Sequence, residues 1–194
     1  MLEVIKTALP GVLEIIPKRF GDDRGYFVET FNADRLKHVG LDVTFCQDNH
    51  SYSRDIGVLR GLHYQMAPFA QDKLVRVTRG RVFDVAVDLR QGSQAYSKWV
   101  GVELSAEKGN QLFIPQGFAH AFLTLEHDCE FQYKVSAYYS PEHDRSIRFD
   151  DPQINIVWPD LPTEVKLSDK DAAAPYLAQA DNNFFYARNG QGDQ

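Results

Sequence analysis

Three polar side chains lie close together in one short stretch of the sequence, and two of them, a histidine and a lysine, could take part in acid–base chemistry. His63 and Gln65 lie two residues apart in LRGLHYQ, and Lys73 begins the apolar segment that follows. The two-residue period of a strand would place His63 and Gln65 on one face. An imidazole titrates near pH ~6.5 and suits general-base catalysis, while a lysine in apolar surroundings can stabilise a developing negative charge. These residue types make the stretch a candidate functional site.

The same stretch resembles the first motif of the cupin barrels, G-x5-H-x-H-x(3,4)-E-x6-G. Gly57, His63 and Gly80 occupy its positions, whereas Gln65 replaces the second histidine and Lys73 replaces the glutamate. Lysine has three donors and no acceptor, so it cannot replace a carboxylate ligand. The resemblance implies a barrel that has kept the shape of a metal site without its ligand set. A lone histidine on an apolar strand is more often a core residue, but the inward lysine favours a functional site.

A second cupin motif strengthens this interpretation. Residues 109–120, GNQLFIPQGFAH, match G-x5-P-x-G-x2-H, with Thr124 in place of a final asparagine. Two motifs in the expected order predict an all-β fold, a cupin-type jelly-roll barrel with a few short helices.

The elements that must position these residues are short strands separated by turns. We expect a helix over Ala33–Val39, with Asn32 as N-cap and Gly40 after its end. Strands are expected at 11–16, after a turn within 20–29, around His63 and Gln65, on either side of the turn 79–81 (through Val75 and Val77, and at 82–89), at 99–104 and at 131–137. The polar run 45–53 favours a surface loop by composition. Asp84 lies in an apolar run, where an unpaired charge would be costly, so we expect it to have a partner such as an imidazole.

Length and charge limit the possible functions. The 194 residues suit a single domain over 1–194, with residues 182–194 expected as a partly flexible tail whose aromatic trio, 184–186, could instead dock on the barrel. A net charge of −6 argues against a nucleic-acid surface. Without an apolar stretch of signal-peptide or membrane-span length, we expect a cytoplasmic protein that does not bind membranes. Two cysteines outside any CxxC arrangement argue against a disulfide framework.

Seven blocks along the chain resemble the dTDP-4-dehydrorhamnose 3,5-epimerase family. They cover nearly the whole length and read FGDDRGYFVE, FCQDNHS, LRGLHYQ, QDKLVRV, DVAVDLR, IPQGFAHAF and LSDKDAAAP. The resemblance implies an isomerase without metal or cofactor that inverts C3 and C5 of a dTDP-linked 4-keto-6-deoxyhexose on the route to dTDP-L-rhamnose.

The resemblance also implies the catalytic residues. His63 would be the base, Asp171 would hold it, Tyr133 would act from the opposite face of the sugar, and Lys73 would lie beside the keto oxygen. By itself, Tyr133 in the apolar row 131–137 reads as a core tyrosine. Asp171 has a second explanation, since Ser168 and Asp171 resemble a capping box at the start of a helix.

Substrate-binding residues are carried over more weakly, and surface charge remains an alternative for the basic ones. Diphosphate partners would be Arg24, Arg60 and Lys170, because arginine in particular matches phosphate oxygens. Further contacts with the sugar and base would come from Gln47, Asn49, His120, Glu29, Phe20 and Tyr138. Asp144 replaces a glutamate usual in the family, so its contact would be one methylene shorter.

The family pattern further implies a homodimer in which N-terminal strands join the partner's sheet, so that residues such as Glu29 complete the neighbouring pocket. Other functions remain open at this point: a mono-epimerase or 3,4-ketoisomerase on a related dTDP-sugar, a metal-dependent cupin such as a dioxygenase, and a non-catalytic sugar-binding barrel. The loss of two usual ligands argues against the metal-dependent class.

Overall fold

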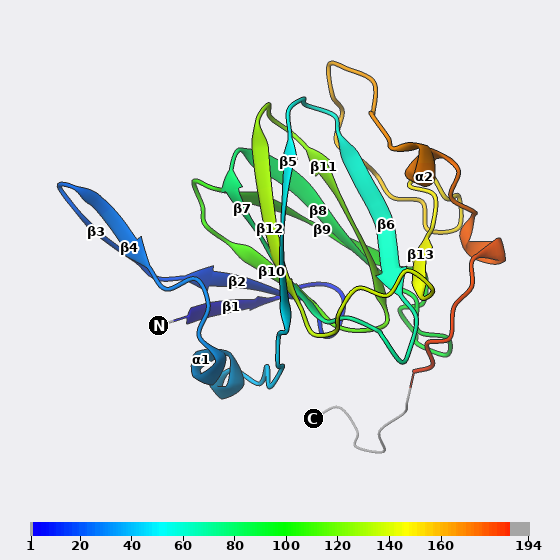
Figure 1. Cartoon of the computed structure of the whole chain (residues 1–194), viewed down its shortest axis with the longest axis horizontal. Coiled ribbons are helices and arrows are strands. Elements are labelled where there is room, and N and C mark those ends of the chain that lie inside the picture. The colour runs from blue at the N-terminus through cyan, green and yellow to red at the C-terminus, as the bar shows by residue number, and fades with distance from the viewer. Residues whose placement is uncertain (1, 187–194) are drawn as a thin grey trace.

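The computed structural model describes residues 2–186, which form two antiparallel sheets packed face to face (Figure 1). The first sheet has the order β1-β2-β10-β7-β12-β5. Its strands are β1 (Leu2–Lys6), β2 (Leu13–Pro17), β10 (Gln111–Ile114), β7 (Lys73–Arg79), β12 (Cys129–Val135) and β5 (Gln47–Ser53). The second sheet has the order β13-β6-β11-β8-β9. Its strands are β13 (Asp144–Ser146), β6 (Leu59–Gln65), β11 (Phe118–Thr124), β8 (Arg81–Asp88) and β9 (Trp99–Ser105). The predicted all-β jelly-roll barrel is confirmed.

A third, two-stranded sheet stands apart from the barrel. Strands β3 (Arg19–Asp22) and β4 (Gly25–Val28) pair as a hairpin that projects away from the two sheets (Figure 1). Its aromatic side chains are largely exposed, with Phe20 at 52% and Phe27 at 69%. We call this hairpin, residues 19–28, the ribbon. A projecting apolar ribbon is unusual for a surface that faces only water.

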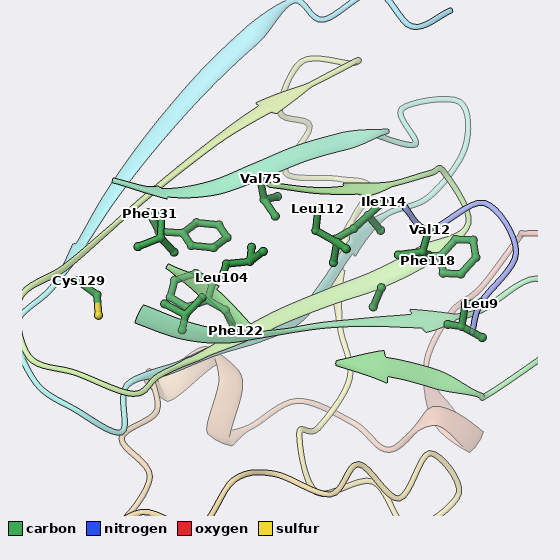
Figure 2. Close-up of a cluster of buried hydrophobic side chains, with 13 residues drawn as sticks. Leu9, Val12, Val75, Leu104, Leu112, Ile114, Phe118, Phe122, Cys129 and Phe131 are labelled. Carbon is green, nitrogen blue, oxygen red and sulfur yellow. The ribbon is translucent and has the colours of Figure 1, made fainter. Parts of the chain in front are cut away.

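The barrel core lies between the two sheets. Valines and leucines of β7, β8 and β10 meet Phe122 of β11 and Phe131 of β12 there (Figure 2). The Phe122 and Phe131 rings are 4.1 Å apart between centroids and 15° from parallel, so they join the two sheets directly. Burial of this apolar surface is the main force that holds the sheets together. It leaves the opposite end of the barrel free to carry polar side chains.

The helices are short. Helix α1 (Ala33–His38) begins at the predicted cap, where the Asn32 side chain accepts a hydrogen bond from the Arg35 amide, and Gly40 follows its end with φ +90°. Helix α2 (Asp169–Ala172) has Ser168 as its N-cap, and a 3-10 turn, η1, covers Leu177–Gln179. Within residues 2–186, none of the helices has the length and apolarity needed to cross a bilayer.

Two expectations from the sequence need correction. The polar run 45–53 is largely a strand rather than a surface loop, because residues 47–53 form β5 and pair in register with β12. Residues 182–186 of the expected tail lie against the barrel. There, Phe184 is buried and Phe185 forms a bridge with Gln91. Residues 187–194 lie outside the described part of the chain.

Candidate active site

A cavity of about 530 Å³ opens between the two sheets at the end of the barrel that carries polar side chains. Several of the predicted site residues line it together: His63, Lys73, Tyr133, Asp171, Arg60, His120, Asp144 and Lys170. They come from both sheets and from helix α2. Residues distant in the sequence therefore converge on one space large enough for a hexose.

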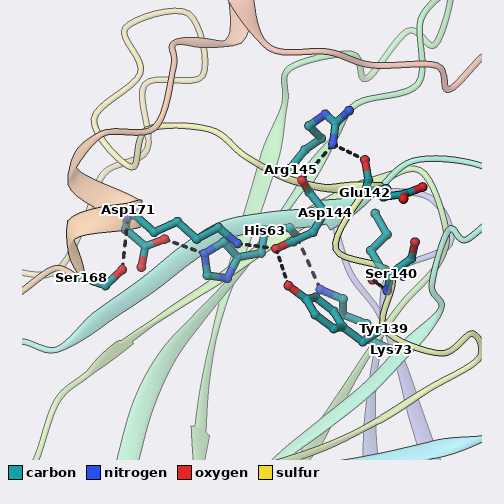
Figure 3. A network of polar contacts seen from close by, with 11 residues as sticks. His63, Lys73, Tyr139, Ser140, Glu142, Asp144, Arg145, Ser168 and Asp171 are labelled. Carbon is teal, nitrogen blue, oxygen red and sulfur yellow. Dashed lines mark hydrogen bonds and ion pairs between the residues drawn. The ribbon is translucent and has the colours of Figure 1, made fainter.

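His63 and Asp171 form a dyad at the cavity wall (Figure 3). His63 Nε2 lies 2.5 Å from Asp171 Oδ1, and the Asp171 side chain is only 4% exposed. Burial alone would raise the pKa of Asp171, but His63, Ser168 and the Gly61 amide bond to its carboxyl and hold the pKa below its ordinary value. The carboxylate is thus charged at neutral pH. It fixes the imidazole orientation and leaves Nδ1 as the ring nitrogen free to accept a proton.

The position of Asp171 resolves its two explanations. Its backbone amide donates to Ser168 Oγ at 3.1 Å and so belongs to the helix cap. Its side chain reaches His63 Nε2, and the Ser168 hydroxyl also helps to lower the pKa of that carboxyl. The Asp171 amide therefore belongs to the helix cap, whereas its carboxylate contacts His63. Helix α2 is the element that positions this carboxylate beside β6.

Lys73 points into the cavity from β7 of the opposite sheet. It is 7% exposed, and its Nζ donates to the His63 carbonyl oxygen at 3.4 Å. Burial lowers the pKa of Lys73 to about 8, against the opposing effect of the negative charges of Asp144 and Asp84. The ammonium is still the main form at neutral pH. It makes one long hydrogen bond to the barrel and has two further protons for an anionic oxygen.

Tyr133 enters the same cavity from β12, beside β7. Burial raises the pKa of its phenol, so the hydroxyl keeps its proton at neutral pH. The base on β6 and the tyrosine on β12 belong to different sheets. A flat ligand between the sheets would therefore meet His63 and Tyr133 on its two faces.

A second histidine–carboxylate pair lies deeper in the barrel. His120 Nε2 is 2.9 Å from Asp84 Oδ2 and 3.1 Å from Oδ1, and Asp84 is fully buried. The predicted imidazole partner of Asp84 is confirmed. Burial lowers the pKa of His120, so the ring is neutral and donates from Nε2 to the carboxylate. Its other nitrogen is left as a hydrogen-bond acceptor.

The wall of the cavity also carries groups suited to phosphate. Lys170 of α2 forms an ion pair with Asp144 of β13, and Tyr139 Oη donates to Asp144 Oδ2 at 3.2 Å (Figure 3). Arg60 of β6 lines the cavity and donates to the Tyr52 carbonyl oxygen at 3.2 Å and, from Nε, to Ser53 Oγ at 3.4 Å. Such cations can hold the oxygens of a diphosphate.

Other predicted binding residues lie outside this cavity. Phe20 and Arg24 are on the ribbon, where Arg24 pairs with Asp22. Glu29 pairs with Arg35 at 3.0 Å. The remaining three lie on or beside the first sheet, namely Gln47, Asn49 and the exposed Tyr138. Glu29 and Asn49 share a second hollow of about 490 Å³ next to β12.

Some cavity residues were missed from the sequence. Ser51 lies on the inward face of β5. A period of two through Gln47 and Asn49 would have found it if the run had been read as a strand. Tyr139 and Lys166 also line the cavity, but they come from irregular segments, where no periodic signal exists.

Gln65 holds the structure together at the position of the second cupin histidine. Its amide donates to the carbonyl oxygens of Phe69 (2.7 Å) and Tyr138 (3.2 Å), and its Oε1 accepts from the Ser140 amide (2.7 Å). Residues 2–186 contain no group of three or more His, Cys, Asp or Glu side chains placed to hold a metal ion. The side chain that replaced a ligand now ties β6 to the loop at the cavity wall.

Comparisons with known proteins agree with this geometry. Residues 6–179 match the family model described as dTDP-4-dehydrorhamnose 3,5-epimerase. A relative of that name from Salmonella typhimurium is 54% identical over 183 residues, 93% of this chain and 98% of the relative. One from Sinorhizobium fredii is 53% identical over 174 residues, 90% of this chain and 89% of the relative. The solved dTDP-6-deoxy-D-glucose-3,5-epimerase RmlC of Legionella pneumophila, in complex with dTDP-4-keto-L-rhamnose, superposes with a TM-score of 0.89 at 48% identity and covers 93% of this chain and 95% of that one.

Proposed function

Because this chain belongs to the dTDP-4-dehydrorhamnose 3,5-epimerase family, we propose that it converts dTDP-4-keto-6-deoxy-D-glucose to dTDP-4-keto-L-rhamnose by inverting C3 and C5. The observation that carries the proposal is the placement of His63 on one sheet and of Lys73 and Tyr133 on the other, around one cavity. Epimerisation needs a base and an acid on opposite faces of a carbon. It also needs a cation at the oxygen that becomes negative.

The proposed chemistry starts from the acidity of the carbons next to the 4-keto group. His63 Nδ1 removes the proton from C3 or C5, and the C–H electron pair moves to give an enolate with its charge on O4. Asp171 stabilises the imidazolium that forms. The Lys73 ammonium stabilises O4, in surroundings where a charge interaction is stronger than in water.

Inversion follows from the second proton transfer. The Tyr133 hydroxyl donates its proton to the carbon from the face opposite His63, and the enolate collapses to the ketone. The tyrosinate formed and the imidazolium then exchange protons with water, which restores both groups. Each carbon thus loses one proton and gains one, with no net change in composition.

Isotope exchange tests the proposal. The protein is incubated with dTDP-4-keto-6-deoxyglucose in D2O with chelator and without added metal, and C3 and C5 are followed by NMR. Deuterium at both carbons is expected. Exchange at one carbon only would make the protein a mono-epimerase, an activity named for the 3'-monoepimerase ChmJ of Streptomyces bikiniensis, whose structure is 35% identical. No exchange, or exchange abolished by the chelator, would refute the proposal.

A variant of the base completes this test. His63→Ala should abolish exchange and leave the affinity for dTDP nearly unchanged, since the imidazole acts on the sugar carbons. A His63→Ala protein that still exchanges would show that the base lies elsewhere.

The ribbon suggests how the nucleotide is held. Phe20 and Arg24 face away from the cavity of their own chain and are exposed, so we propose a homodimer in which the ribbon of one chain completes the nucleotide site of the other. Glu29, at the end of the ribbon, would reach the base of the partner's nucleotide. The diphosphate also makes the substrate too polar to cross a membrane unaided, which favours the cytoplasm as the place of action.

Complementation between two inactive variants tests the dimer. Mixed dimers of His63→Ala and Arg24→Ala chains contain one site with both native residues if Arg24 acts in the partner's site. Co-expression should then restore activity that neither variant has alone. Failure of the mixed dimers to regain activity would show that Arg24 serves its own chain or no site.

A further inference from the structure

Asp144 joins three segments around the cavity. It begins β13 and pairs in register with Gln65 of β6. Its Oδ2 accepts a hydrogen bond from Tyr139 Oη at 3.2 Å and forms the ion pair with Lys170 of α2 (Figure 3). The Asp144 side chain is mostly buried, whereas Lys170 is half-exposed. One fixed carboxylate therefore holds a flexible cation at the cavity wall.

The charges along the cavity allow Lys170 to exchange Asp144 for an anionic ligand. Asp144 and Asp171 are its two lining carboxylates within residues 2–186, and Asp171 is already held by His63. A diphosphate entering the cavity brings more negative charge and competes with Asp144 for the same cations. Lysine is a compact charge on a long flexible stem, so it can change partners at little cost.

Lys73 lines the same cavity as Asp144 and Lys170. The charged and titratable groups around it are Asp84 of β8, His120 of β11, Arg60, His63 and Tyr64 of β6, Tyr133 of β12, Tyr139 and Asp144 at and before β13, and Lys166, Lys170 and Asp171 at and before α2. After burial, the largest influence on the pKa of Lys73 is Asp144, which raises it, while Lys170 lowers it. Moving Lys170 away from Asp144 would therefore favour the protonated form of Lys73.

We infer that Asp144 holds Lys170 ready for the substrate diphosphate and releases it on binding, which leaves the Asp144 carboxylate to act on Lys73. Asp144 is then a positioning residue that couples occupation of the nucleotide site to the charge beside the keto oxygen. The inference rests on the proposed function, because it assumes a diphosphate ligand and an enolate at O4.

Asp144→Asn separates binding from catalysis. The amide keeps the shape of the side chain but no longer competes for Lys170, so dTDP should bind about two- to fivefold tighter by calorimetry. The alkaline limb of the kcat profile should move to lower pH by about half a unit or more, because the charge that supports the Lys73 ammonium is lost. A purely structural role would weaken binding and activity together.

A double-variant cycle tests whether Lys170 is the group through which Asp144 affects dTDP binding. Lys170→Met removes the ammonium and retains the stem, so Asp144→Asn should have no further effect on dTDP affinity in that background. Asp144→Glu keeps the charge and should bind dTDP like the native protein. Asp42→Asn serves as control, because it removes a carboxylate from an exposed lysine pair remote from the cavity.

The outcomes are distinguishable. Provided that the native protein turns over, three results would each overturn the inference. Asp144→Asn binds dTDP no more tightly than the native protein, its alkaline limb of kcat does not move, or its tighter binding persists in the Lys170→Met background. A native protein without turnover would instead show that the proposed function is wrong.

Discussion

Replacing Lys73 by methionine should stabilise the fold while it removes activity. Lys73 is 7% exposed, and burial lowers the pKa of its ammonium from the ordinary value of 10.5 to about 8. That difference corresponds to about 3 kcal/mol of folding free energy spent on keeping the charge inside the barrel. Methionine has a similar length and no charge, so Lys73→Met should raise the free energy of unfolding at pH 7 by up to about 3 kcal/mol.

The pH dependence gives the sign of the effect. Between pH 8 and 10.5 the folded protein has released the Lys73 proton, whereas the unfolded chain still binds it. Native stability therefore rises with pH through this window by an amount that the Lys73→Met protein lacks. Tyrosines and cysteines that titrate in the same range do so in both proteins, so their contributions cancel in the difference.

Urea unfolding at pH 7 and at pH 10 measures both effects. The variant should be more stable at pH 7, and its advantage should shrink at pH 10. The turnover number should fall about 100-fold or more, because the charge at O4 is lost. Lys37→Met, at an exposed ion pair with Asp42, should change stability by less than about 1 kcal/mol. A Lys73→Met protein that is less stable at pH 7, or has the same pH slope as the native chain, would refute the reasoning.

Three further changes, with Gly92→Ala as a control for one of them, test other parts of the structure. Asp171→Asn removes the charge that stabilises the imidazolium and should lower kcat by about 10²- to 10³-fold with nearly unchanged dTDP affinity, as steady-state kinetics and calorimetry will show. Gly61→Ala should destabilise the protein in urea by more than about 2 kcal/mol, because φ is +121° and a Cβ would meet backbone of the adjacent strand at 2.5 Å. Gly92→Ala, with a positive φ but open space around its Cβ position, should cost less in the same titration. Phe131→Ala should cost about 3 to 5 kcal/mol, since the ring is buried and joins the two sheets.

The sequence was most informative where local chemistry decides the structure. The Asn32 cap, the strands around Gly80 and the imidazole partner of Asp84 were all predicted correctly, because each follows from a short-range rule or from the cost of an unpaired buried charge. The two barrel motifs predicted the fold for the same reason. They combine turn glycines with inward side chains at fixed spacing.

Composition gave the wrong prediction for residues 47–53, where a strand lacks the usual alternation of apolar and polar residues. Strand β5 is polar on both faces, since Gln47, Asn49 and Ser51 point one way and Asp48 and His50 point the other. A polar strand looks like a loop when its partner strand is unknown. Its register with β12 depends on contacts between residues far apart in the sequence, and such pairing cannot be read from a local window.

Long-range geometry also decided which residue the Asp171 side chain contacts. The capping rule and the family resemblance each accounted for the residue, and no feature of the sequence could divide them. The helix places its amide and its carboxylate in different directions, and this separation is visible only in three dimensions.

The delivery of Asp171 by helix α2 has a consequence for the time at which the protein becomes active. His63 and Asp171 are separated by 108 positions along the chain, so a ribosome makes the imidazole long before it makes the carboxylate that orients it. A nascent chain can pair its first strands and close much of the barrel while the dyad is still incomplete. Helix α2 therefore completes the dyad, and a chain that ends before Asp171 would lack the carboxylate that orients the His63 imidazole.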